Sequence, residues 1–288
     1  MCQRYMRKIT SNSVGIGLRN EHIAALLQEP RQQDIDFLEV VPDNWMNIGG
    51  AKKESLTEIY KKYPLVAHSL SLSIGDVLPL NEEYIKNIRC FLDEYHIDIY
   101  SDHLCFSRDA QGYLYDLFPV PRYTAVIPYL VERIKRVQDI LGRQLVLENV
   151  SSYYSYDNEI PEDEFWCELL HHSGCGMLMD INNIYVNSFN HGFDALEYIK
   201  KIPTKSIVYY HIAGHLEHAE LKLDTHGMPV LEDVIALARN TFLIHGARPL
   251  LLERDNNIPD LIALCEELKD INGYITNGRY CELTPFSS

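Results

Sequence analysis

The chain has 288 residues, of which 41 are Asp or Glu and 26 are Lys or Arg, so its formal net charge is −15 at pH 7. Apolar residues make up 46% of it and charged residues 23%, which is typical of a globular protein and excludes a disordered or fibrous one. The excess of acid argues against binding to nucleic acid or anionic lipid, since Lys and Arg hold phosphate groups. No run approaches about 18 apolar residues, so we expect no membrane span.

The N-terminus and the cysteines indicate the compartment. The first eight residues include three basic ones, but no apolar run follows, so they do not resemble a signal peptide. The cysteines are odd in number, irregularly spaced and without a C-x-x-C pair, which predicts reduced thiols in the cytoplasm and no disulfide framework or thiolate zinc site. They are Cys2, Cys90, Cys105, Cys167, Cys175, Cys265 and Cys281.

Eight short apolar runs, rich in Val, Ile, Leu and Tyr, alternate with longer amphipathic segments along the chain. Runs of this length and composition predict buried parallel strands. In chain order they cover residues 14–18, 36–41, 65–70, 97–104, 144–149, 177–181, 207–213 and 249–253.

Several segments between these runs carry helix signals. The predicted helices cover residues 20–27, 81–95, 123–141, 161–172 and 259–269. Asn20 and Asn81 are expected to cap the first two at their N-termini. Gly142 and Gly174 stand where the glycine that follows many helices belongs.

Eight strand–helix units without a break in composition predict an α/β fold, a (β/α)₈ TIM barrel built as a single domain over residues 1–288. An open, doubly wound sheet is the alternative, although six strands are more usual in that fold. The tail, residues 270–288, has no clear periodicity; it either covers one end of the barrel or is loose.

Polar residues stand at the end of nearly every predicted strand, where the active site of such a barrel lies. For Arg19 and Glu39, on the first two strands, we favour a structural role such as a buried ion pair. A single His or Asp at a strand end is also more often a structural group than a ligand. The remaining strand ends carry His68, Asp102, His103, Glu148, Asn149, Asp180, Asn182, His211, His215 and Glu253.

The combination of these residues points to metal. In a barrel, six of them would converge on one cavity, and without a cation three carboxylates would repel one another at low dielectric. Imidazole and carboxylate ligands suit Fe, Mn or Zn. Six ligands exceed the needs of one ion, so at least two ions are expected, with Glu148 as a bridge. The six are His68, His103, Glu148, Asp180, His211 and Glu253.

Two further segments have open interpretations. Asp224 and His226 are either third-site ligands or part of a solvated loop. The Ser- and Tyr-rich segment 151–156 either lines a substrate groove at the mouth of the site or is an ordinary polar loop.

The ordered motifs of the chain resemble the multinuclear non-haem iron-dependent oxidative enzymes, once a family of unknown function, whose best-known member acts in methanobactin biosynthesis. The resemblance covers about residues 13–268. Two departures are Asp43, where Glu is commoner, and Arg254, where many members have Trp. The motifs are VGIGLRNEH at 14–22, Glu39 with DNWM at 43–46, HSLSLSIG at 68–75, SDHL at 101–104, DLFP at 116–119, LENVSSY at 147–153, DINNIYV at 180–186, NHG at 190–192, HIAGH at 211–215, DTHG at 224–227 and ERD at 253–255.

The resemblance implies a xylose isomerase-like TIM barrel with two or three iron ions, Fe(II) or Fe(III), at its mouth and O₂ as co-substrate. It implies that the six convergent residues are ligands, and that Asn149, Asp224 and His226 are ligands or helpers. Glu148, Asp180, Asn182 and His215 are expected to act in catalysis. The implied substrate is a ribosomally made, cysteine-containing precursor peptide, often presented by a separate partner protein.

The leading hypothesis is therefore an iron- and O₂-dependent oxidase or oxygenase that modifies peptide cysteine. A Zn- or Mn-dependent hydrolase or sugar isomerase on the same barrel is the alternative. An abasic-site endonuclease of that group is disfavoured by the net charge. A non-catalytic metal-binding protein is the third hypothesis, disfavoured because a structural role needs no open redox-metal site.

Overall fold

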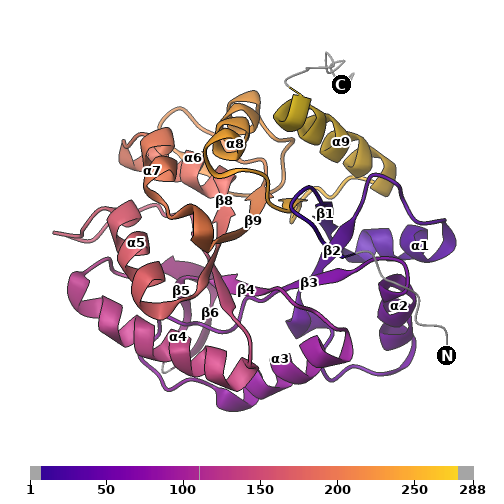
Figure 1. The fold of residues 1–288 in the computed structure, drawn as a ribbon, viewed down its shortest axis with the longest axis horizontal. Helices are drawn as coiled ribbons and strands as arrows, with labels where there is room; N and C mark the ends of the chain where they lie inside the picture. The colour runs from indigo at the N-terminus through magenta and orange to yellow at the C-terminus, as the bar shows by residue number, and fades with distance from the viewer. Residues whose placement is uncertain (1–7, 110, 278–288) are drawn as a thin grey trace.

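The computed structural model describes residues 8–109 and 111–277. Eight parallel strands close into a barrel, and helices surround it (Figure 1). Around the barrel the order is β1-β12-β9-β8-β7-β4-β3-β2, so each strand of the predicted barrel pairs with its neighbours in the chain and the last pairs with the first. The (β/α)₈ prediction is confirmed. The strands are β1 Val14–Gly17, β2 Phe37–Val40, β3 Leu65–His68, β4 Tyr100–His103, β7 Leu145–Glu148, β8 Gly176–Asp180, β9 Ile207–Ile212 and β12 Leu250–Leu252.

One layer of buried apolar side chains fills the barrel interior. Successive residues of a strand point to opposite faces, so alternate residues enter the barrel. The layer forms a separate hydrophobic cluster, while a much larger cluster lies between the strands and the helices. The buried interior residues are Phe37, Val66, Val146, Leu178, Tyr209 and Leu251.

Nine α-helices lie within the described residues. Asn81 caps its helix as expected, accepting a hydrogen bond from the amide of Tyr84 at 3.0 Å. Gly142 and Gly174 both follow helices with φ of 68°, as predicted. The helices are α1 Asn20–Gln28, α2 Gly50–Tyr60, α3 Glu82–Glu94, α4 Ile127–Leu141, α5 Glu162–Ser173, α6 Ile181–His191, α7 Ala195–Lys201, α8 Glu232–His245 and α9 Leu261–Asn277.

Several helix boundaries differ from the prediction. Helix α4 begins at Ile127 instead of residue 123, because a 3₁₀ turn precedes it. Asn20 is the first residue of α1 rather than its cap; Arg19 occupies the cap position and its side chain makes no capping bond. The last helix does not end at Lys269 but continues to Asn277, because Ile271 and Ile275 extend its buried face. The remainder of the tail, residues 278–288, lies outside the described residues.

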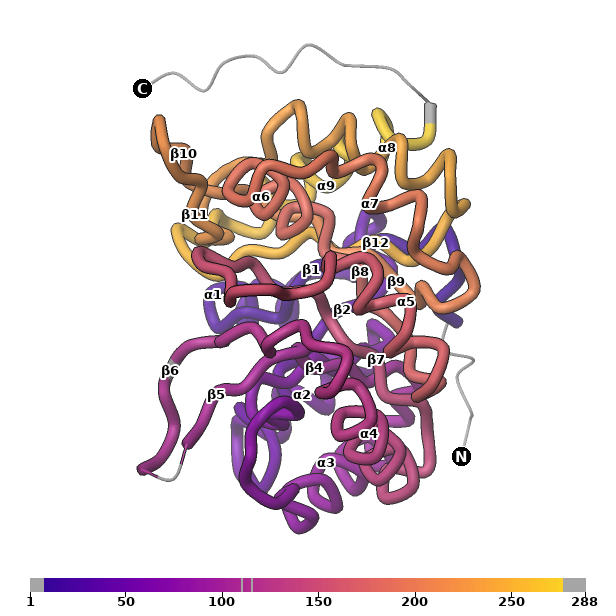
Figure 2. Tube along the Cα trace, turned by 90° about the vertical axis from the view of Figure 1, so that its left-hand side faces the viewer, coloured from indigo at the N-terminus to yellow at the C-terminus, as the bar shows by residue number. Residues whose placement is uncertain are grey.

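Two hairpins extend the strand ends on one side of the barrel, β5 Cys105–Asp109 with β6 Gly112–Pro119, and β10 Leu216–Glu217 with β11 Lys222–Leu223 (Figure 2). Three 3₁₀ turns, Pro42–Asn44, Thr124–Val126 and Thr204–Ser206, complete the connections. No helix in the described part of the chain is long and apolar enough to cross a membrane. Cys90, Cys105, Cys167, Cys175 and Cys265 are free thiols, whereas Cys2 and Cys281 lie outside the described residues.

Candidate metal centre

Five of the six convergent residues form a second layer above the apolar one, because each stands two residues after a residue of that layer. His68 follows Val66, and Glu148 follows Val146, so the two-residue period turns both ligands into the barrel. Six polar residues, each on or directly after a different strand, stand two positions after an interior residue. The pairs of positions are 37 and 39, 66 and 68, 146 and 148, 178 and 180, 209 and 211, and 251 and 253.

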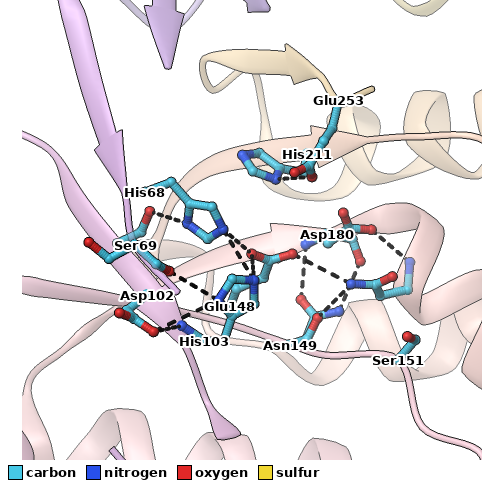
Figure 3. Close-up of polar contacts among 12 residues, drawn as sticks. His68, Ser69, Asp102, His103, Glu148, Asn149, Ser151, Asp180, His211 and Glu253 are labelled. Atoms are coloured by element: carbon cyan, nitrogen blue, oxygen red, sulfur yellow. Dashed lines mark hydrogen bonds and ion pairs between the residues drawn. The ribbon is translucent and has the colours of Figure 1, made fainter. Parts of the chain in front are cut away.

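His68, His103 and Glu148 form the first ligand group (Figure 3). The Nε2 atoms of the two histidines lie 3.2 Å apart, and Glu148 Oε2 lies 3.0 Å from one and 3.3 Å from the other. Ligand atoms about 2.1 Å from one ion lie about 3.0 Å apart in octahedral and about 3.4 Å apart in tetrahedral geometry. The three distances therefore match the edges of one coordination polyhedron.

The hydrogen bonds on the far side of both rings favour this interpretation. His103 Nδ1 lies 3.2 Å from the carbonyl oxygen of Ser69, which can only accept, so this nitrogen carries the proton. His68 Nδ1 lies 2.8 Å from Ser101 Oγ. With Nδ1 of both rings bonded elsewhere, both Nε2 atoms point at Glu148 Oε2, a buried atom that has no hydrogen-bond partner among the described residues. Such a cluster needs positive charge at its centre, from protons or from a metal ion, so these residues fit a metal ion.

Glu148, Asp180, His211 and Glu253 form the second group, in which one ligand atom from each lies within 4.8 Å of the others. Asp180 ends β8 and caps α6, since its Oδ1 accepts the amide of Asn183 at 2.7 Å. That bond aims its buried Oδ2 toward the group, where it has no hydrogen-bond partner within the described structure. His211 Nδ1 lies 2.9 Å from Glu253 Oε2.

His226, Glu253 and Asp255 form the third group. Glu253 Oε2 lies 3.4 Å from His226 Nδ1, so this carboxylate belongs to two groups, as Glu148 does. Asp224 lies 2.6 Å from the opposite ring nitrogen, Nε2. Burial opposes the charged form of His226, but Asp224 and Glu253 outweigh burial and raise its pKa well above the ordinary value. The segment that carries Asp224 and His226 therefore packs against the third group and lines the cavity, rather than forming a solvated loop.

Arg19 joins this third group and does not pair with Glu39 as expected. Its guanidinium contacts Asp255 and lies 3.7 Å from Glu253. Glu39 instead accepts hydrogen bonds from His211 and Tyr209. Arg19 thus balances part of the acidic charge that the third group gathers.

Burial and charge shift the proton affinities of the centre. Burial and the charge of Glu148 raise the pKa of Asp180 to about 8. Burial opposes the charged form of His103, yet Glu148 and Asp102 raise its pKa to about 9. In the metal-free chain, protons therefore supply the positive charge that the carboxylates require, and a metal ion would displace them.

A cavity of about 630 Å³ opens above these groups. One wall is acidic and carries members of all three groups, although Asp180 and His211 are not among the lining residues that the structure describes. The other wall is apolar or aromatic and comes from the β3 loop, strand β6 and the segment after β7. Segment 151–156 thus contributes to the cavity wall, as its substrate-groove interpretation requires. The second wall consists of Leu70, Leu117, Phe118, Val150, Tyr153 and Tyr154.

Besides Asp224, three predicted site residues lie beside the ligand groups instead of within them. Both amide atoms of Asn149 bond the backbone of Asp180, at 2.9 Å each, so the geometry favours a supporting role over ligation. Asn182 links His215, at 2.7 Å, to Asp224, at 3.0 Å. The buried His215 is not among the residues that line the cavity within the described structure.

Sequence reasoning missed Asp255 as a candidate ligand and Glu39 as a partner of His211. Asp255 belongs to the motif at the end of the last strand, which was a usable signal. The two departures from the family motifs are structural: Asp43 accepts a hydrogen bond from Tyr84 at 3.0 Å, and Arg254 turns away to pair with Glu267 of α9.

A family model described as "RiPP precursor modification enzyme MbnB/TglH/ChrH" matches residues 13–276. The chain belongs to this family. Two relatives, both named UPF0276 protein, support the assignment. The one from Acinetobacter baylyi is 46% identical and the alignment covers 90% of this chain and 89% of the relative. The one from Shewanella oneidensis is 43% identical, and the alignment covers 91% of this chain and 93% of the relative. The family's description names modification of ribosomally made (RiPP) precursor peptides as its role.

Solved structures confirm the fold alone. A xylose isomerase domain protein from Planctomyces limnophilus superposes with a TM-score of 0.57 and 14% identity, covering 92% of this chain and 99% of that one. The D-psicose 3-epimerase of Clostridium cellulolyticum, solved with D-tagatose, gives a TM-score of 0.55 at 10% identity over 89% of each chain. At such identity the likeness establishes a xylose isomerase-like barrel and no shared chemistry.

Proposed function

We propose that this member of the RiPP precursor modification family is an iron- and O₂-dependent oxidative enzyme that acts on a cysteine of a precursor peptide. The observation that carries the proposal is the chain of three ligand groups joined by Glu148 and Glu253. Imidazole and carboxylate ligands without thiolate suit non-haem iron, and two shared carboxylates suit two or three neighbouring ions. Bound iron would supply the redox chemistry and the activation of O₂.

The side chains of this chain would position those ions and the substrate. His68, His103 and Glu148 would hold one ion, and Glu148 with Asp180, His211 and Glu253 would hold a second. In the third group, Asp224 and His226 would hold or steer an additional ion beside Glu253. Asn182 and His215 would act on catalysis through Asp224, which Asn182 contacts directly.

The two walls of the cavity would contact different parts of the substrate. The acidic wall places the ligands in reach of a thiol that enters from the mouth, while the apolar wall would pack the residues beside the cysteine and exclude water. Tyr153 lies close to the third ligand group, since its hydroxyl oxygen accepts a hydrogen bond from the backbone amide of Asp224 at 3.0 Å. A separate partner protein could present the peptide at this mouth.

The proposal is tested by metal reconstitution. The metal-free chain is loaded anaerobically with Fe²⁺, Zn²⁺ or Mn²⁺, then given O₂ and peptides encoded by reading frames beside its gene, each also as a Cys→Ser version. We expect O₂ uptake and a mass change on cysteine only with iron and the cysteine form. Activity that follows Zn²⁺ or Mn²⁺, needs no O₂ and acts on a sugar or phosphodiester would replace this proposal with a hydrolase or isomerase. Metal retention without any turnover would support a non-catalytic protein.

A further inference from the structure

A continuous hydrogen-bond chain runs through the barrel interior beneath the metal centre. His68 Nδ1 lies 2.8 Å from Ser101 Oγ, and Ser101 Oγ lies 2.6 Å from the hydroxyl of Tyr209. The Tyr209 hydroxyl donates to Glu39 Oε2 at 2.9 Å, and the same oxygen lies 3.1 Å from His211 Nε2. All five side chains are buried. The chain therefore connects a histidine of the first ligand group to the histidine of the second.

The carboxylate of Glu39 sets the direction of every bond in this chain. A carboxylate only accepts, so the Tyr209 hydroxyl and His211 Nε2 both donate to it. The Tyr209 oxygen then accepts from Ser101, whose alternative acceptor, the carbonyl of Ala67, is farther away at 3.3 Å. Ser101 Oγ in turn accepts from His68 Nδ1.

The hydrogen-bond chain therefore leaves one nitrogen of each ring to face the ligand groups. His68 uses Nδ1 in the chain and turns Nε2 toward His103 and Glu148. His211 uses Nε2 in the chain and turns Nδ1 toward Glu253, to which it donates a hydrogen bond until an ion takes the place of that proton. Metal-binding histidines commonly gain orientation and basicity from such a partner on the other ring nitrogen.

We propose that Glu39, Tyr209 and Ser101 are positioning residues that fix the metal-binding nitrogens of both His68 and His211 through one shared hydrogen-bond chain. The inference rests on the metal sites of the proposed function. It assigns Glu39 a role that reaches across the barrel, from β2 through β9 and β4 to β3. Neither Tyr209 nor Ser101 touches the cavity; both act through the histidines.

The surroundings argue that these hydroxyls serve the centre and not the packing. The nearby interior positions of the other strands are apolar, as at Val66, Val146 and Leu178. A Phe at position 209 would bury the same ring without a polar atom, and burying a hydroxyl costs free energy unless it is bonded. Hydroxyl groups stand only where they join the ligand groups in this part of the described barrel, at Ser101 and Tyr209.

The test compares two neighbouring tyrosines of β9. Tyr209→Phe removes the hydroxyl of the chain, whereas Tyr210→Phe removes one that bonds the carbonyl of Gly246 on the outer side of the barrel. The metal-free proteins are titrated with Co²⁺, whose visible absorption reports ligand geometry. We expect Tyr209→Phe to raise the dissociation constant about 10–100-fold and to change the spectrum, and Tyr210→Phe to match wild type in both.

Two further variants test whether a single hydrogen-bond chain serves both histidines. They are Ser101→Ala and the double variant that combines Ser101→Ala with Tyr209→Phe. Ser101→Ala should weaken Co²⁺ binding like Tyr209→Phe, and the double variant should lose no more than the larger single loss, because either change breaks the same chain. If Tyr209→Phe does not fold, Ser101→Ala alone decides. Normal binding by Tyr209→Phe and Ser101→Ala, or losses that multiply in the double variant, would overturn the inference. Failure of wild type to bind Co²⁺ or Fe²⁺ would instead refute the metal sites of the proposed function.

Discussion

At the scale of single residues, Glu148 is the carboxylate on which the centre depends most. It belongs to two ligand groups, and one of its oxygens faces two imidazole nitrogens without a hydrogen-bond partner in the described structure. Burial opposes its charged form, but His103 and His68 outweigh burial and lower its pKa. It is therefore expected to be ionised and available to metal.

Glu148→Gln should remove most bound metal while the chain stays folded. The amide keeps the shape but loses the charge that two ions would share, and it relieves repulsion with Asp180. Elemental analysis after iron loading should show at least a tenfold loss, on the order expected for a lost ligand. Glu58→Gln, an exposed substitution on α2, is the control and should load fully. Full loading of Glu148→Gln would remove this residue from the ligand set.

The raised pKa of Asp180 should make the stability of the metal-free chain depend on pH. The pKa of Asp180 is about 8 in the folded chain and 3.8 for an ordinary aspartate, so between these values the folded state binds more protons than the unfolded state. Stability from this group is therefore present at low pH and falls as pH rises through 8. The melting temperature without metal should drop by at least about 2 °C from pH 5 to pH 8.

Asp180→Asn should flatten this dependence, because the neutral amide has no proton to lose. Asp194→Asn is the matched control, since Asp194 also caps a helix, α7, through its side chain. It should keep the pH dependence of wild type. An equal slope in wild type and Asp180→Asn would show that Asp180 is not the group responsible.

The sequence predicted which candidate ligands meet at the barrel mouth, because chemistry and position agreed in each. His68, His103 and Glu148 are ligand types at strand ends, and the two-residue period turned them inward. Tyr209 and Ser101 could not be found this way, since hydroxyls inside strands carry no metal signal. Their role depends on contacts between strands far apart in the sequence.

At the scale of elements, the loop after β3 is held by one buried guanidinium from α4. Arg133 donates to the carbonyl oxygens of Ile74 at 2.7 Å and Leu78 at 2.8 Å, and lies 3.4 Å from Asp76. Asp76 also pairs with Arg108, which lies near the turn of the β5–β6 hairpin. Arg133 thereby supports two segments that border the cavity.

Arg133→Met should destabilise the chain by about 3 kcal/mol, because it leaves buried carbonyls and a carboxylate without their donor. Arg136→Met, three residues along the same helix, removes an exposed pair with Glu82 and should cost less than about 1 kcal/mol. Urea unfolding of the metal-free proteins measures both. Equal effects would mean that the buried network does not stabilise the loop.

All eight barrel strands were predicted from their apolar runs, because every barrel strand is buried on both faces. The helices were predicted less completely, and α2 is one that was missed. Helix α2 buries only Leu56 and Ile59, so its apolar stripe is too narrow to stand out. The hairpins β5–β6 and β10–β11 were missed, since they are largely open to solvent and lack a strong alternating pattern.

At the scale of the whole molecule, the candidate metal centre draws its residues from most of the barrel. Its ligands come from β3, β4, β7, β8 and β9 and from the segments after β9 and β12, so bound ions would cross-link the strands. They would also neutralise the carboxylates that the closed barrel brings together. Metal should therefore stabilise the folded chain against heat.

Removal of metal by a chelator should lower the melting temperature by about 5 °C or more, as expected when an ion at about 100 times its dissociation constant is withdrawn. Calorimetry of iron-loaded and stripped protein measures the difference. Glu148→Gln should show little shift under the same treatment. A melting temperature independent of metal in wild type would contradict binding at the barrel mouth.

The most direct test of the central claim is an anomalous difference map at the iron absorption edge from crystals of the iron-loaded protein. The account predicts at least two peaks above the barrel, one beside His68, His103 and Glu148 and one beside Asp180, His211 and Glu253. Each should lie about 2.0–2.3 Å from its ligand atoms. A map with no peak at either group, from crystals whose iron content is confirmed by elemental analysis, would contradict it.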